Sequence, residues 1–102
     1  ARPAHDSREQ RRERARQRKE LHERTRELKR AVAQVEKRIA AIEAEQTDLH
    51  RQLADPATQP PARAAAGRRL YEVDIELAKA MQQWEADSTR LAAVGREEPE
   101  DA

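Results

Sequence analysis

Residues 21–53 read LHERTRELKRAVAQVEKRIAAIEAEQTDLHRQL, and this stretch decides the fold. Its large apolar residues follow one another at spacings of 7, 4, 3, 4, 3, 7 and 4, and they are Leu21, Leu28, Val32, Val35, Ile39, Ile42, Leu49 and Leu53. Such spacing is typical of a helix with one apolar seam, formed by the a and d positions of a heptad repeat. Thr25 and Gln46 are the polar residues within it. Because one helix cannot bury so narrow a stripe alone, the sequence predicts a partner helix.

The partner lies later in the same chain. A second apolar pattern, interrupted by Asp87, consists of Leu70, Val73, Leu77, Ala80, Trp84, Leu91 and Val94. Pro56, Pro60 and Pro61 lie between the two patterns and exclude one continuous helix. We therefore predict an all-α fold, an antiparallel two-helix coiled-coil hairpin with a long basic helical extension at its N-terminal end.

In an antiparallel hairpin, the numbers of facing residues have a constant sum. A sum of 119 places seam positions opposite seam positions, pairing Ile39 with Ala80 and Val35 with Trp84. We therefore expect Trp84 to be a core residue, rather than an exposed ring on which a nucleic-acid base could stack. Tyr71 is expected to pack beside the seam.

The expected organisation has three parts. They are a basic lead with a helical extension or linker over residues 1–20, the hairpin over residues 21–94 and a disordered acidic tail over residues 95–102. Within the chain we predict a first helix over about 7–54, a loop over 55–60 and a second helix over about 61–94.

Composition fits this elongated architecture better than a globular one. The 102 residues include no Phe or Cys, and 40% are charged, which is too little apolar material for a conventional core. The absence of cysteine is compatible with the cytoplasmic location that we predict. No apolar run approaches the roughly 18 residues that span a bilayer, so we expect no membrane partner. The chain begins at Ala1 rather than Met, and we expect it to be a fragment of a longer protein.

Charge is distributed unevenly along the chain. Residues 1–30 contain 12 Lys/Arg against 6 Asp/Glu, residues 31–94 contain 8 against 10, and residues 95–102 contain 1 against 4. Before Leu21 the seam positions are occupied by Arg11, Arg14 and Arg18, which cannot pack through apolar contacts. The candidate nucleic-acid-binding residues are Arg8, Arg11, Arg12, Arg14, Arg16, Arg18 and Lys19 in this segment, with Arg63, Arg68 and Arg69 near the hairpin tip. The alternative is a solvated helix, supported by internal ion pairs, that only links domains.

Catalytic and metal-binding patterns are missing from the sequence. There is no glycine-rich phosphate loop, no cysteine ligand set and no supported Ser/His/Asp arrangement. His22 and His50 would lie roughly 42 Å apart on one helix, too far to share a metal ion. We predict that this fragment is not an enzyme and holds no metal or cofactor of its own.

Several short motifs point to a known family. They are KRIAAIEAEQ at residues 37–46, Leu53-Ala54-Asp55-Pro56 at the turn and Trp84-Glu85 in the second helix. Over roughly residues 20–88 the chain resembles the C-terminal coiled-coil domain of ABC-F ATP-binding proteins, especially the Uup branch. The stretch from Ser7 to Arg30 resembles the basic segment that joins the second ATPase domain to this hairpin.

The resemblance implies a parent protein that binds ATP and magnesium in other domains. Members of the family act on ribosomes, and the Uup C-terminal domain is associated with DNA binding. We therefore predict a monomeric, non-catalytic accessory domain that binds nucleic acid, with DNA preferred over rRNA. The alternatives are an arm that contacts the ribosome, and a purely structural coiled-coil spacer.

Overall fold

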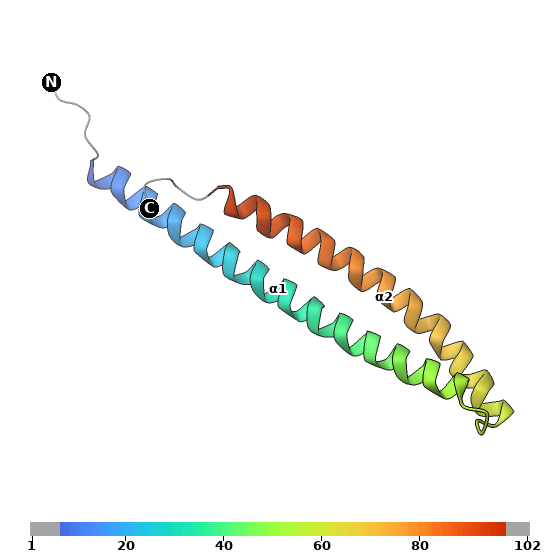
Figure 1. Cartoon of the computed structure of the whole chain (residues 1–102). Helices are drawn as coiled ribbons and strands as arrows, with labels where there is room; N and C mark the ends of the chain where they lie inside the picture. The colour runs from blue at the N-terminus through green and yellow to red at the C-terminus, as the bar shows by residue number, and fades with distance from the viewer. Residues whose placement is uncertain (1–6, 98–102) are drawn as a thin grey trace.

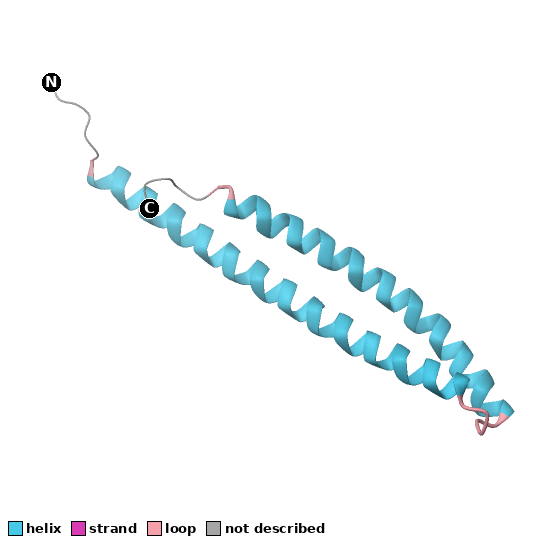
Figure 2. Cartoon of the chain, viewed as in Figure 1, coloured by secondary structure: helices cyan, strands magenta, loops and turns pink. Residues whose placement is uncertain are grey.

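The computed structural model describes residues 7–97, which form two long helices and a short loop. Helix α1 spans Arg8–Ala54 and helix α2 spans Pro60–Gly95, and the chain reverses direction between them (Figure 1). The rod measures 87 × 15 × 14 Å. Figure 2 shows only helix and loop over the described part of the chain, so the predicted all-α hairpin is confirmed. The lead predicted before Ser7 and most of the predicted acidic tail lie outside the described residues.

Local signals set where the helices begin and end. The Ser7 hydroxyl accepts a hydrogen bond from the Gln10 amide at 3.0 Å, and the Gln10 side chain accepts one from the Ser7 amide at 2.9 Å. This reciprocal cap satisfies two amides that otherwise lack partners at a helix start. Helix α1 stops before Asp55, and α2 opens with Pro60 and Pro61, which lack the amide hydrogens that a first turn leaves unpaired. Neither helix has a stretch within residues 7–97 that is long and apolar enough to cross a membrane.

The buried residues of α2 recur every seven positions, and most of them are small. They are Ala66, Val73, Ala80, Asp87 and Val94, which form one of the two seam rows of α2. The other seam row contains larger side chains, including Leu70, Leu77 and Leu91, but these are only half-buried. The small row therefore lies between the two helices, and the large row covers the flank of the interface.

The hairpin core is thin. Ile42 on α1 forms a buried cluster with Val73 and Ala80, and Ile39, Leu49 and Leu77 pack against it. Val73 is the only large side chain in the described part that is fully buried, with 0% of its surface exposed. The chain has no cysteine and therefore no disulfide, and a single seam of this kind stabilises a small scaffold by only ~3–5 kcal/mol.

The prediction that Trp84 is a core residue is wrong. Trp84 is 36% exposed, and its indole nitrogen donates a hydrogen bond to the Glu36 carboxylate of α1 at 3.0 Å. It occupies the large row of α2, which lies at the flank because the small row fills the centre of the interface. Tyr71 is 70% exposed, so the expectation that it packs beside the seam is also wrong.

We expect Trp84→Ala to cost on the order of 1–2 kcal/mol, less than the roughly 3–5 kcal/mol of a fully buried tryptophan. Trp84→Phe should cost less than the alanine change, because it keeps the ring against α1 and loses only the bond to Glu36. Urea denaturation followed by circular dichroism measures both. A loss above ~3 kcal/mol for the alanine variant would show that the buried part of the indole acts as core after all.

Asp87 is a buried carboxylate in the middle of an apolar seam. Its residue is 4% exposed, and its carboxylate accepts hydrogen bonds from the Gln83 amide at 2.9 Å and from the Arg90 guanidinium at 3.4 Å. Both donors come from α2 itself and satisfy the carboxylate at the edge of the seam. Because Asp87 faces Val32 in the predicted register, an apolar contact is lost here. Asp87 therefore interrupts the apolar seam between the buried residues Ala80 and Val94.

The polar seam residues of α1 are also satisfied. The Gln46 amide nitrogen donates to the Asp74 carboxylate across the interface at 2.8 Å, and the Thr25 hydroxyl donates to the Leu21 carbonyl at 2.9 Å. The first of these contacts agrees with the predicted register, in which Gln46 faces the residue just before Asp74. No buried side-chain nitrogen or oxygen within the described residues lacks a hydrogen-bond partner.

Candidate nucleic-acid interface

The first helix continues past the end of the second. Arg24 forms an ion pair with Glu97 at 3.6 Å, which marks the level on α1 at which the described part of the chain leaves α2. Residues 8–20 of α1 therefore have no helix opposite them within the described structure (Figure 1). At 1.5 Å per residue this extension is ~18 Å long.

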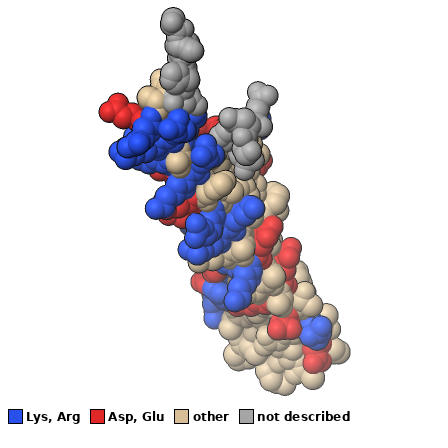
Figure 3. All heavy atoms as spheres, turned by 90° about the vertical axis from the view of Figure 1, so that its left-hand side faces the viewer, with Lys and Arg blue, Asp and Glu red and all other residues tan. Residues whose placement is uncertain are grey.

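Basic side chains are concentrated on this extension. Residues 7–20 contain 7 Lys/Arg against 3 Glu. On the face that Figure 3 shows, Lys and Arg atoms gather at this end of the rod, and the tip at the opposite end is mostly uncharged. Within the predicted set, Arg14 and Arg18 are half-buried, and the exposed members are Arg8, Arg11, Arg12, Arg16 and Lys19.

Three of these arginines continue the hairpin seam. Arg11, Arg14 and Arg18 follow the same spacing as the apolar residues that begin at Leu21, and they therefore lie on the face of α1 that packs against α2 further along. Their row is ~10 Å long at 1.5 Å per residue. Where apolar packing ends, the same face thus becomes a row of guanidinium groups.

Glutamates moderate the charge of the extension. Arg16 donates hydrogen bonds to the Glu13 carboxylate and lies 4.0 Å from that of Glu20. The bond to Glu13 raises the pKa of the Arg16 guanidinium above its ordinary value. Carboxylates of its own helix therefore balance the charge of Arg16.

At the tip, Arg63 closes the turn. Its guanidinium donates to the carbonyl oxygens of Leu53 at 2.5 Å, Asp55 at 3.0 Å and Thr58 at 3.4 Å. These include carbonyls that the last turn of a helix leaves without an internal partner. The sequence pattern had marked Arg63 only as a basic residue near the tip, and the structure shows it holding the end of α1 against the start of α2.

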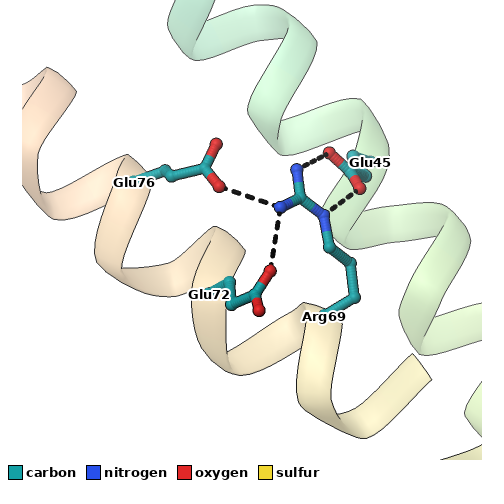
Figure 4. A network of polar contacts seen from close by, with 4 residues as sticks. All are labelled: Glu45, Arg69, Glu72 and Glu76. Carbon is teal, nitrogen blue, oxygen red and sulfur yellow. Dashed lines mark hydrogen bonds and ion pairs between the residues drawn. The ribbon is translucent and has the colours of Figure 1, made fainter. Parts of the chain in front are cut away.

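Arg69 is surrounded by three carboxylates (Figure 4). Its guanidinium contacts Glu45 of α1 through two bonds of 2.7 and 3.0 Å, and it contacts Glu72 at 3.2 Å and Glu76 at 2.9 Å on α2. These bonds raise the pKa of Arg69 above its ordinary value. The cluster is negative in sum, so Arg69 fastens the two helices together and presents no excess positive charge.

The predicted binding residues therefore fall into two groups at opposite ends of the rod. The structure places the seven residues of the extension on one stretch of helix. Of the three near the tip, Arg63 and Arg69 contact their own chain, while Arg68 is exposed. The sequence signal for the Arg69 cluster was the pair of glutamates three and seven residues after it, but the contact with Glu45 depended on the pairing of the helices.

The Arg69 cluster gives the hairpin a pH dependence. The hydrogen bond from Arg69 lowers the pKa of Glu45 below its ordinary value of 4.5. A carboxylate with a lowered folded-state pKa stabilises the fold above its ordinary pKa, and this contribution is lost as the pH falls through the lowered value. Glu45→Gln should therefore lower the thermal unfolding midpoint near neutral pH and have little effect at the acid end of a pH series. The exposed Glu43→Gln is the matched control, and equal effects of the two changes at neutral pH would contradict this assignment.

Comparison with known proteins identifies the hairpin but not the extension. The family model described as ABC transporter C-terminal domain matches residues 23–86, more than half of the chain. No curated protein and no solved structure matches the chain. The matched range covers the loop and most of both helices, and it begins after the arginine-rich segment.

Proposed function

The chain belongs to the ABC transporter C-terminal domain family, and we propose that it is a non-catalytic accessory domain that binds nucleic acid through the extension of α1. DNA is the proposed target. Its parent would be an ABC-F type ATPase of the Uup branch, located in the cytoplasm, with ATP and magnesium bound in other domains. The family membership predicted from the motifs is confirmed, whereas the branch, the location and the target are parts of the proposal.

The observation that carries the proposal is the change of chemistry along one helix face. From Leu21 onward this face buries apolar side chains against α2, and before Leu21 it carries Arg11, Arg14 and Arg18. The described part of α2 does not extend over this stretch of the face, so these arginines do not pack in the apolar seam. A polyanion releases its counterions when basic side chains neutralise its phosphates, and this release favours binding.

The shape of the extension suits a phosphate backbone more than base edges. A straight helix with basic residues spread over ~18 Å can follow several phosphates in succession. Arg63 and Arg69 already contact their own chain, so the proposal assigns the binding to the extension and leaves Arg68 as a secondary contact. We therefore expect binding with little sequence preference.

A second candidate function is an arm that contacts ribosomal RNA. The observation that favours it is the 87 Å length of the rod, which would hold the hairpin tip far from the basic extension. Structured RNA also presents phosphates, which are arranged along A-form helices. The glutamates between the arginines favour the third candidate, a structural spacer, because they reduce the charge available to any polyanion.

Titration of labelled duplex DNA and of a structured RNA at about 50 and 200 mM salt tests the proposal. If ~4 phosphates are neutralised, the logarithm of the affinity should fall against the logarithm of salt with a slope near −3.6, so affinity should drop by about two orders of magnitude. We expect dissociation constants in the micromolar range at low salt. A marked preference for the RNA would support the ribosomal arm, and no binding to either at low salt would leave the spacer.

A further inference from the structure

The large apolar side chains that are exposed in the described part of the chain all lie on α2. They are Tyr71, Ile75, Met81 and Trp84. Tyr71 is 70% exposed, and Ile75, one helical turn further on, is 42% exposed. Residues four positions apart adjoin on a helix surface, so these two side chains form one apolar patch. Neither is part of the buried seam, and the patch is open to a ligand.

Two cations border this patch. The residues of this face of α2 follow one another at spacings of 3, 4 and 4, and they are Arg68, Tyr71, Ile75 and Lys79. The face is ~16 Å long at 1.5 Å per residue. All four side chains are exposed, and within residues 7–97 neither cation forms an ion pair. An aromatic ring thus lies on the same helix face as two cations that have no carboxylate partner there.

The acidic residues on this stretch of α2 already have partners. Arg69 holds Glu72 at 3.2 Å and Glu76 at 2.9 Å, and both point toward its guanidinium (Figure 4). The Asp74 carboxylate accepts a hydrogen bond from Gln46 of α1 at 2.8 Å. These carboxylates therefore bond to groups at the helix interface, and the two cations beside the patch remain available to a phosphate.

We propose that this face is a stacking site for an unpaired base of single-stranded nucleic acid. The Tyr71 ring stacks on the base, while Arg68 and Lys79 contact the phosphates next to it. The site is separate from the extension of α1, and it does not depend on the duplex binding proposed there. In the predicted register Tyr71 lies at the level of Asp48, ~42 Å along α1 from residue 20.

The shape of the patch favours a base over a helix of another protein. A docked helix inserts apolar anchors at several successive turns, whereas this face offers only two large apolar side chains. A base needs one exposed ring, which Tyr71 supplies. Trp84 suits a base less well, because its indole nitrogen bonds to the Glu36 carboxylate at 3.0 Å, and that charge repels a phosphate.

Tyr71 is the only tyrosine of the chain, which makes the site directly observable. Fluorotyrosine incorporated at this position gives a single fluorine resonance. The full chain is titrated with an oligothymidylate of ~8 nucleotides, and with an abasic oligomer of the same length, at about 50 mM salt. The abasic oligomer has phosphates but no bases, so we expect it to bind this site at least about fivefold more weakly. Equal affinities, or no shift at millimolar oligonucleotide, would overturn the stacking site.

Arg68→Gln combined with Lys79→Gln tests the phosphate contacts. The dissociation constant obtained from the fluorine shift should rise by roughly threefold to tenfold. The control removes two exposed cations of α1, with Lys37→Gln and Arg38→Gln. It should change the constant by less than about twofold, because both residues lie ~15 Å or more along the rod from the tyrosine, beyond a screening length of ~10 Å. Equal effects of the two variants would overturn the phosphate contacts.

The same measurements separate this site from the proposed function. If duplex DNA does not bind but the oligothymidylate shifts the fluorine resonance, the proposed function fails and the stacking site stands. If duplex DNA binds and the resonance stays unchanged, the stacking site alone fails.

Discussion

Ile42→Ala should remove most of the stability of the hairpin. Ile42 is 6% exposed and packs with Val73 and Ala80 at the centre of the buried cluster. Removing a buried isoleucine side chain in favour of alanine costs roughly 2–5 kcal/mol, from the lost transfer free energy and the cavity left behind. A scaffold of this size is stabilised by only ~3–5 kcal/mol. The urea midpoint of the variant should therefore fall sharply, and part of the population should already be unfolded at room temperature, as measured by helical circular dichroism and urea denaturation.

The chain offers a matched control for this change. Ile75 is 42% exposed on α2, so Ile75→Ala removes the same atoms from a site that is largely in water. We expect it to cost less than ~1 kcal/mol. A similar loss for both variants would show that the seam assigned from burial does not carry the stability. Retention of the native urea midpoint in Ile42→Ala would lead to the same conclusion.

The second large effect is expected from the basic row. Replacing Arg11, Arg12, Arg14 and Arg18 by glutamine removes four cations from the extension while keeping good helix-forming side chains. If these are the groups that neutralise phosphates, affinity for DNA at about 50 mM salt should fall by roughly 100-fold, and the slope against salt should approach zero. Titration at several salt concentrations measures both quantities.

The control for this variant removes four cations from exposed sites within the hairpin, with Lys37→Gln, Arg38→Gln, Arg51→Gln and Lys79→Gln. It should weaken binding by less than about tenfold, since these charges are screened from the extension over more than a Debye length of ~10 Å. Both variants should keep the thermal unfolding midpoint of the parent within a few degrees, because none of the eight residues is in the buried seam. Equal losses in the two variants would indicate a response to total charge rather than a binding face.

Much of the fold followed from spacing alone. The apolar residues of α1 and α2 repeat with a heptad period, which specifies two helices that pack along one seam. Pro56, Pro60 and Pro61 specify where the chain reverses, because proline cannot continue a helix interior. The arginines before Leu21 likewise showed that packing must end there, since no apolar seam position remains.

For the candidate binding residues too, the sequence predicted one part and the folded structure was needed for the other. The extension is a local feature of one helix, so the sequence was enough to place its seven basic residues together. The sequence was not enough to assign roles to the basic residues near the tip. Arg63 and Arg69 looked equivalent to the others as basic residues, and only the folded chain assigned one to the carbonyls of the turn and the other to Glu45. Partner choice of this kind depends on groups far apart in sequence that a periodic pattern does not connect.

Trp84 shows what periodicity leaves open. The heptad pattern determined that Trp84 lies on the face of α2 toward α1, and this is where it is found. The pattern did not determine which of the two seam rows would occupy the centre of the interface. That depended on side-chain volume, because Ala66 and Ala80 allow the helices to meet along the small row and displace the large row to the flank. Sequence determined the elements and their facing surfaces, and tertiary packing decided the depth of each residue within them.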